Sequence, residues 1–205
     1  MAKLKKTKNE LKAQREALRR YERFLPTLEL KKQQLQREVR RVEAALRDAQ
    51  AVEQAVLAGF RPWARLLSAT PSLQLEEYVR VAAVERETAN IAGVNVPVLG
   101  EVRFESAPVD YVDTPAWLED AVTTLCDLTR LRAQQLTLER QKALLGEELR
   151  ITAQRVNLFE KVMIPRAEDS IRAIRIALGD AQTAAVARAK IAKGKGAELL
   201  SGSGT

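Results

Sequence analysis

The chain has no histidine and only one cysteine in 205 residues. Without histidine, general acid–base catalysis and metal ligation by imidazole are excluded. The single Cys126 can form neither an internal disulfide nor a zinc or iron–sulfur site, and we expect it to be a buried, unreactive thiol. The phosphate-binding motif G-x-x-x-x-G-K-[ST] is also missing, so no P-loop nucleotide site is expected. The sequence therefore predicts a chain with no catalytic residues, cofactor or metal of its own.

Aromatic residues make up only 4% of the chain, and there are only 9 glycines. Leu, Ala, Arg, Glu and Gln are plentiful, which is the composition of long helices rather than of a thick mixed core. No stretch approaches the roughly 20 apolar residues that a membrane-spanning helix needs. The opening MAKLKKTKNE is basic with no apolar run behind it, so no signal peptide is expected. These absences predict a cytoplasmic chain that is not inserted in a membrane.

Apolar residues recur at alternating steps of three and four from Leu4 to Val56. This heptad period buries one narrow stripe of a helix and leaves the rest in water. Pro26 removes one backbone hydrogen bond, but the seam keeps its register on both sides, so we expect one kinked helix rather than two. Gly59 and Pro62 are expected to end it. The expected buried seam of this arm includes Leu11, Leu18, Leu25 and Leu35.

A second heptad stretch runs from about Leu118 to about Ala185. From Met163 through Ala167 to Ile171 it advances by four residues twice, a stutter that locally unwinds a supercoil. The last residues, GKGAELLSGSGT, have little to bury, so a disordered tail is expected from 194 onward. The expected buried seam of this arm consists of Val156, Phe159, Met163, Ile171, Ile174 and Leu178.

Between the arms, β-type alternation appears over about residues 78–105, most clearly where three valines alternate with Asn95 and Pro97. This pattern predicts a small β-hairpin with a turn at Ala92-Gly93, and a further turn could lie at Leu99-Gly100. Pro97 restricts its segment to an edge strand or a bulge.

Residues 107–117 are expected to form a loop before the second arm. Asp113 or Thr114 is the expected N-cap of that arm, with Pro115 in its first turn.

The charge is divided unevenly along the chain. Residues 1–56 hold 15 basic and 8 acidic side chains, residues 57–149 hold 9 and 14, and residues 150–196 hold 10 and 4. The two arms are thus basic and the middle is acidic. A basic arm favours an acidic partner, either a nucleic acid or an electronegative protein surface.

Together these patterns predict a mainly α fold: a long antiparallel two-helix coiled coil with a short β-hairpin in the middle. The expected parts are an N-terminal arm (1–58), a middle region (59–116), a C-terminal arm (117–193) and a disordered tail (194–205). The first arm would be roughly 80 Å long at about 1.5 Å per residue, whereas a compact domain of this length has a radius of gyration of roughly 17 Å. A rod of this kind suggests a mechanical or scaffolding task.

Three separated segments resemble the D subunit of V-type and archaeal-type ATPases and ATP synthases, of the bacterial kind. KTKNELKAQREALRRYERFLPTLELKKQQLQ (6–36) resembles its opening, and NIAGVNVPV (90–98) followed by DTPAW (113–117) resembles its middle. RVNLFEKVMIPRAEDSIRAIRIALGDAQTAAVARAKIAK (155–193) resembles its closing helix, although the Ala-rich DAQTAAVAR (180–188) is less bulky and less charged than that family's pattern. The matches occur in the family's order and cover nearly the whole chain.

The resemblance implies a non-catalytic central rotor shaft that couples nucleotide turnover to ion translocation. It implies a position on the cytoplasmic side of the membrane, with the paired arms inside a ring of catalytic A and non-catalytic B subunits. The F subunit would bind beside the shaft, and another subunit would link it to the membrane rotor ring. The basic residues expected to face the ring at the tip are Arg188, Lys190 and Lys193, for which a solvated helix end is the alternative.

Two other classes of function remain open from the residues alone. A coiled coil that binds nucleic acid is favoured by the basic arms, but few aromatic residues are available there for base stacking. A structural adaptor without a rotary role would have the same helical pattern. Steeply salt-dependent DNA binding would support the first, and co-purification with A and B subunits separates a complex subunit from both.

Overall fold

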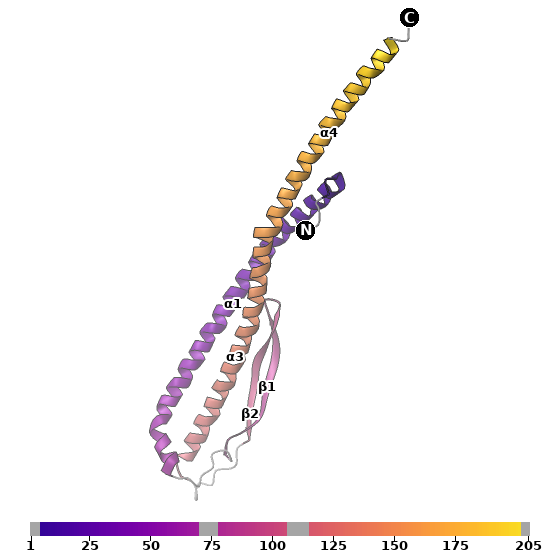
Figure 1. Ribbon diagram of the computed structural model, residues 1–205. Helices are drawn as coiled ribbons and strands as arrows, with labels where there is room; N and C mark the ends of the chain where they lie inside the picture. Colours follow the sequence, from indigo (N-terminus) through magenta and orange to yellow (C-terminus); the bar gives the residue numbers. More distant parts are fainter. Residues whose placement is uncertain (1–4, 70–77, 106–114, 202–205) are drawn as a thin grey trace. The chain divides into compact units, whose positions relative to one another are not determined.

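The computed structural model describes residues 5–69, 78–105 and 115–201. The fold is mainly α, with two strands in the middle of the chain (Figure 1). Its elements are α1 (Lys8–Ala69), β1 (Arg80–Ile91), β2 (Val94–Glu105), α3 (Leu118–Leu158), the π-helix η1 (Phe159–Met163) and α4 (Ile164–Ser201).

The chain divides into two compact units. Met1–Leu30 and Ala153–Thr205 form one, here called the terminal unit, and Lys31–Thr152 forms the other, here called the hairpin unit. The beginning of α1 pairs with α4 in the terminal unit, and the remainder of α1 pairs with α3 in the hairpin unit. Each unit is therefore built on two helices that lie far apart in the sequence.

Helix α1 begins with a side-chain cap. The backbone N–H of Glu10 donates to Oγ1 of Thr7 at 3.2 Å, and the N–H of Leu11 donates to the carbonyl of Thr7 at 3.0 Å. Thr7 followed by Glu10 has the spacing of a capping box, which satisfies N–H groups that have no partner inside the helix. From there α1 continues without a break through Pro26, as the unbroken heptad register predicts.

The predicted end of α1 near Gly59 is wrong, because the helix continues to Ala69 and includes Pro62. A glycine in a helix interior costs about 1 kcal/mol and a proline about 3 kcal/mol. A second helix lies beside this stretch: Val56 and Phe60 of α1 line one pocket together with Ala121 of α3. Local propensity by itself therefore does not locate the end of α1.

The predicted hairpin is confirmed. β1 and β2 pair in antiparallel register from Arg80↔Glu105 to Ile91↔Val94, and the turn lies at Ala92 and Gly93, with φ of 52° and 82°. Positive φ at both positions matches the tight turns that twist with the flanking strands. The side chain of Asn90 accepts a hydrogen bond from the N–H of Gly93 at 3.1 Å and so supports the turn.

No turn forms at Leu99-Gly100, which lie inside β2. The pairing shifts instead between Val84 and Arg86, opposite this glycine. A Cβ on Gly100 would lie 3.1 Å from Cβ of Glu85 and 3.2 Å from its carbonyl oxygen. Glycine is therefore needed here for close backbone approach at a bulge, not for a reversal of the chain.

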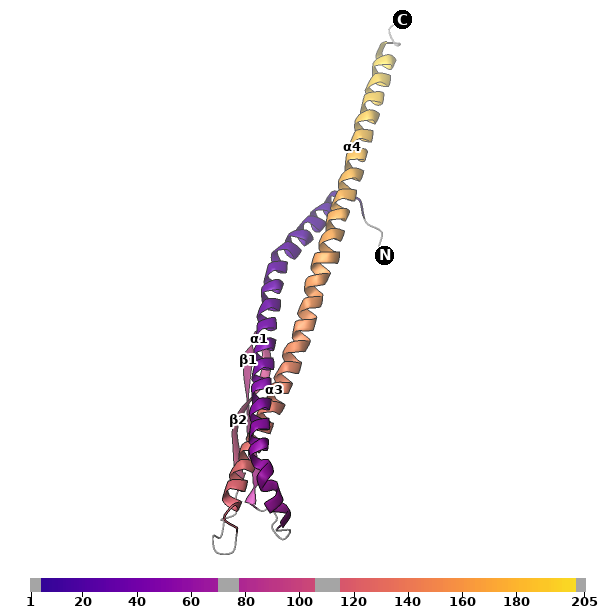
Figure 2. The same ribbon diagram turned by 90° about the vertical axis from the view of Figure 1, so that its left-hand side faces the viewer.

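The core of the hairpin unit lies between α1, α3 and β2. Leu35, Val42, Leu145 and Val96 form one buried cluster. Lys31 contacts Glu148, Glu43 contacts Lys142, and Glu53 contacts Gln135. Because numbers rise along α1 as they fall along α3, the two helices are antiparallel. Both views show the hairpin alongside this helix pair (Figures 1 and 2).

The stutter in the second arm directly follows η1, where the helix widens by one residue. The N–H of Ile164 donates to the carbonyl of Phe159, five residues back. Pro165 follows directly; its ring clashes with the carbonyl four residues earlier and it has no N–H to donate. A π turn relieves this clash.

Helix α4 ends at Ser201, so the tail expected from 194 onward is corrected for residues 194–201, which are helical. Glycine lowers helix propensity by about 1 kcal/mol, but the flanking Lys, Ala, Glu and Leu are good helix formers. The expected N-cap at Asp113 or Thr114 and the last residues 202–205 lie outside the described part of the chain. None of the described helices is both long and apolar enough to cross a membrane.

Candidate functional site

The two ends of the chain pack along an apolar seam in the terminal unit. Val156, Ile171 and Ile174 of the second arm are at most 6% exposed, and Ala167 is 3% exposed. Fully burying a side chain such as Val or Ile stabilises the fold by about 1.5–3 kcal/mol. Phe159, Met163 and Leu178 are half-buried, as are Leu11, Leu18 and Leu25 on α1. Leu35, from the same predicted seam, is fully buried in the hairpin unit.

An aromatic pair joins the arms in the terminal unit. The rings of Tyr21 and Phe159 are 5.3 Å apart between centroids, tilted by 53°. Aromatic pairs at this separation contribute about 0.5–1.5 kcal/mol beyond the area that they bury. Because Tyr21 rises from α1 and Phe159 is the first residue of η1, the widened turn lies directly at a contact between the arms.

The predicted basic tip lies on α4 beyond the residues that pack on α1. Arg188, Lys190 and Lys193 are all exposed, as is every residue of 181–193. Figure 1 shows α4 continuing past the start of α1. Within the described chain, none of these three side chains forms an ion pair. The structure thus presents them to solvent, where a partner could reach them.

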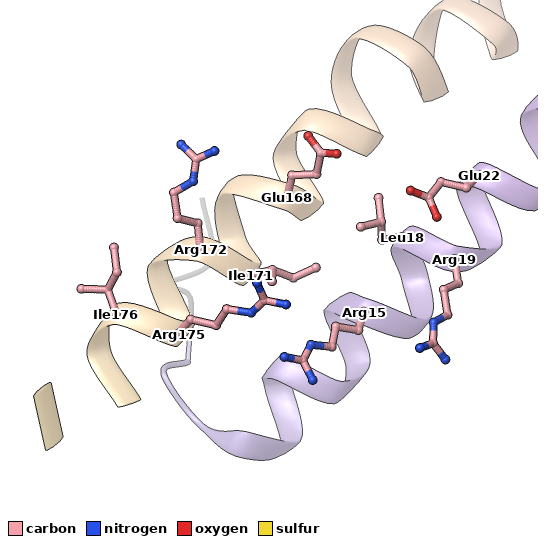
Figure 3. Close-up of a pocket in the computed structure, with 9 residues that line it drawn as sticks. All are labelled: Arg15, Leu18, Arg19, Glu22, Glu168, Ile171, Arg172, Arg175 and Ile176. Atoms are coloured by element: carbon pink, nitrogen blue, oxygen red, sulfur yellow. The ribbon is translucent and has the colours of Figure 1, made fainter. Parts of the chain in front are cut away.

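A groove lined by arginines lies between α1 and α4 in the terminal unit (Figure 3). Arg15 and Arg19 line it from α1, and Arg172 and Arg175 line it from α4. Sequence reasoning missed this cluster, although each pair is spaced by three or four residues and so shares one helix face. The remaining lining residues are Leu18, Glu22, Glu168, Ile171 and Ile176.

Buried polar side chains hold the hairpin unit together, and these too were missed. Gln135 is 1% exposed; its Nε2 donates to Oε2 of Glu53 at 2.8 Å and to the carbonyl of Ala49 at 3.3 Å. Gln141 is 8% exposed, and its Nε2 donates to the carbonyl of Pro97 at 2.6 Å. Glutamine at a helix–helix contact gives no apolar signal, so only the packing reveals its role.

The described residues hold little that could carry out chemistry. Among them, no group of three or more Cys, Asp or Glu side chains is placed to hold a metal ion. Cys126 is half-buried rather than fully buried, and desolvation raises the pKa of its thiol above the usual range. A raised pKa leaves less reactive thiolate at neutral pH. The arrangement is suited to packing and to contacts between charged surfaces.

Comparison with known proteins accounts for nearly the whole chain. A model of the family described as the D subunit of ATP synthase matches residues 10–194. A protein of Borreliella burgdorferi, named as the D subunit of V-type ATP synthase, is 41% identical over 193 residues, which cover 94% of this chain and 95% of that protein. This chain belongs to the ATP synthase D subunit family. The resemblance seen in its three separated segments is thereby confirmed.

Other D subunits of V-type ATP synthases match over the same span. Those of Chlamydia muridarum and Chlamydia trachomatis serovar L2 are 32% and 33% identical over 193 residues, again 94% of this chain and 95% of each relative. All three relatives are bacterial, as the resemblance suggested. The matches take in both arms and the hairpin, so the likeness to this family extends beyond a shared coiled-coil pattern.

Proposed function

We propose that this chain is the non-catalytic central rotor shaft of a V/A-type ATPase or ATP synthase. The observation that carries the proposal is the antiparallel pairing of the chain's two ends along a buried apolar seam, in a member of the D subunit family. A single helix bends and twists easily, whereas two helices packed along a seam resist both. Such a pair can transmit torque between a ring that turns over nucleotide and a rotor that carries ions.

Coupling requires that the shaft contact the ring differently at different angles. Each nucleotide state of the ring then favours one shaft angle, and turning the shaft shifts the nucleotide states in return. The exposed charges of the arms suit this task. Lys12 and Glu16, for example, lie 3.9 Å apart with side chains 80% and 57% exposed, and such pairs contribute only about 0–1 kcal/mol. Weak contacts can be exchanged without holding the shaft at one angle.

The partners follow from this role. The terminal unit would lie inside the ring of A and B subunits, where Arg188, Lys190 and Lys193 at the tip would face the ring. The F subunit would bind beside the shaft, and the subunit that links the shaft to the membrane rotor would meet the middle of the chain. The chain would be a peripheral component on the cytoplasmic side of the membrane, without a nucleic-acid partner.

Direct observation of rotation tests the proposal. The ring is fixed to a surface through its A subunits, and a bead is attached to the chain at Glu87→Cys, an exposed hairpin position, in a Cys126→Ser background. We expect ATP to drive one-way rotation of the bead. A bead attached to a B subunit is the matched control and should stay still. A chain that stays still in a ring that hydrolyses ATP would be an adaptor, and the shaft role would be wrong.

A further inference from the structure

The arginine groove of the terminal unit has an uneven arrangement of charge. Four arginine residues line it, against two acidic residues, Glu22 and Glu168. Within the described chain, none of the four arginines forms an ion pair with a carboxylate. Like charges gathered on two facing helices oppose the pairing of those helices. A partner that supplies negative charge would remove this repulsion.

The four arginines are not equivalent. In Figure 3 the side chains of Arg15 and Arg175 extend into the space between α1 and α4, whereas those of Arg19 and Arg172 extend away from it. We call Arg15 and Arg175 the inner pair and Arg19 and Arg172 the outer pair. A planar guanidinium can hold both oxygens of one carboxylate, so two that approach from opposite helices can hold an acidic side chain between them.

The rest of the groove favours a protein partner over a nucleic acid. Its lining includes Leu18, Ile171 and Ile176, and Ile176 is 60% exposed. Among the described residues, no aromatic side chain lines it, so these residues offer bases no surface on which to stack. The chemistry therefore matches a short acidic segment with apolar side chains beside its carboxylates.

We propose that this groove is a docking site for a carboxylate-bearing segment of the subunits that surround the terminal unit, with its acidic side chains held by Arg15 and Arg175. The proposal rests on the proposed function, which places a ring of partner subunits around this unit. It assigns the charge recognition to two arginines in the body of the arms, distinct from the basic tip of α4.

Binding of the full-length chain to the purified A/B ring of the same complex tests the site. The double variant Arg15→Gln/Arg175→Gln removes the inner pair, and Arg19→Gln/Arg172→Gln removes the same charge from the outer pair. We expect the inner variant to bind the ring about tenfold more weakly or worse, and the outer variant to stay within about threefold of wild type. Arg15→Lys/Arg175→Lys keeps the charge without the two-pronged geometry and should fall between them.

The outcomes separate this site from the proposed function. If the wild-type chain does not bind the ring, the shaft role and the site are both overturned. If wild type binds and both double variants lose affinity equally, the attraction is general basic charge and the site is wrong. Inner-variant binding equal to wild type also overturns it. The site is also wrong if the inner variant loses binding of sodium polyphosphate but keeps the wild-type affinity for the ring. Unaltered circular dichroism spectra and melting temperatures confirm that the variants are folded.

Discussion

The two units of this chain each contain a pair of packed helices, but they bury different kinds of side chain. Among the terminal-unit residues whose burial is described, the buried side chains are all apolar: Val156, Ala167, Ile171 and Ile174. In the hairpin unit, an apolar cluster is accompanied by buried polar side chains. These are Gln135, Thr137, Gln141 and Thr152. Both units pair α1 with an antiparallel helix. They differ because the helices of the hairpin unit also pack against the β-hairpin.

A purely apolar seam stabilises a helix pair but specifies its register weakly, because one apolar layer resembles the next. A buried polar group has few positions at which its hydrogen bonds are satisfied, and it fixes register at some cost in stability. Gln135 fixes α3 against α1, and Gln141 fixes α3 against the hairpin. We infer that buried polar side chains fix the helix register within the hairpin unit, whereas the helices of the terminal unit are held by apolar packing.

The largest expected effect comes from placing a charge in the apolar seam. Ile174→Asp should lower the free energy of unfolding by about 4 kcal/mol or more, because Ile174 is fully buried and the carboxylate would have no partner there. Ile176→Asp, on the same helix but 60% exposed, is the control and should change stability by less than about 0.5 kcal/mol. Denaturant unfolding measures both, and equal effects would disprove the seam.

A cavity in the hairpin unit should cost somewhat less. Leu145→Ala removes a fully buried side chain that packs with Leu35, Val42 and Val96, and should cost about 2–5 kcal/mol. Leu136→Ala, whose side chain is 51% exposed on the same helix, should cost well under half as much. Thermal and denaturant melts measure the difference. If the two variants were equally stable, the core would not lie where the buried cluster places it.

Removing the hydrogen bond between Gln141 and the hairpin should have a smaller and more local effect on stability. Gln141→Leu leaves the carbonyl of Pro97 without its donor and should cost about 1–3 kcal/mol. Hydrogen exchange should show faster exchange in β1 and β2, with the terminal unit unchanged. Gln134→Leu, at an exposed position of α3, serves as control. Uniformly faster hydrogen exchange in both units would show that this hydrogen bond does not act only on the hairpin.

The smallest expected effect is a change in the pKa of Glu147, an exposed carboxylate. The side-chain hydrogen bond from Arg150 holds the pKa of Glu147 below its usual 4.5. A lowered folded pKa gives stability that is present above the unfolded pKa and is lost as pH falls through the folded pKa. Arg150→Gln should return the pKa of Glu147 toward 4.5, as measured by NMR titration, and Arg140→Gln should leave it unchanged. The stability difference between Arg150→Gln and wild type should vanish in acid.

Local rules predicted much of the architecture and failed at helix ends. The heptad period located both arms, and the dipeptide Ala92-Gly93 located the hairpin turn because its φ requirements are local. The same local reasoning ended α1 near Gly59 and α4 near Lys193, and both helices continue. Around Gly59, α1 faces α3 across a pocket, and α3 is distant in sequence, so no window around the glycine contains it.

The sequence by itself determined the type of fold, the period of the seam and the family, because apolar spacing and segment order are properties of the linear chain. Only the tertiary structure decided which polar residues are buried and which arginines face one another. Gln135, Gln141, Arg15 and Arg175 look like ordinary surface residues in the sequence. Their roles depend on partners on another helix or on the hairpin, and packing alone brings those partners together.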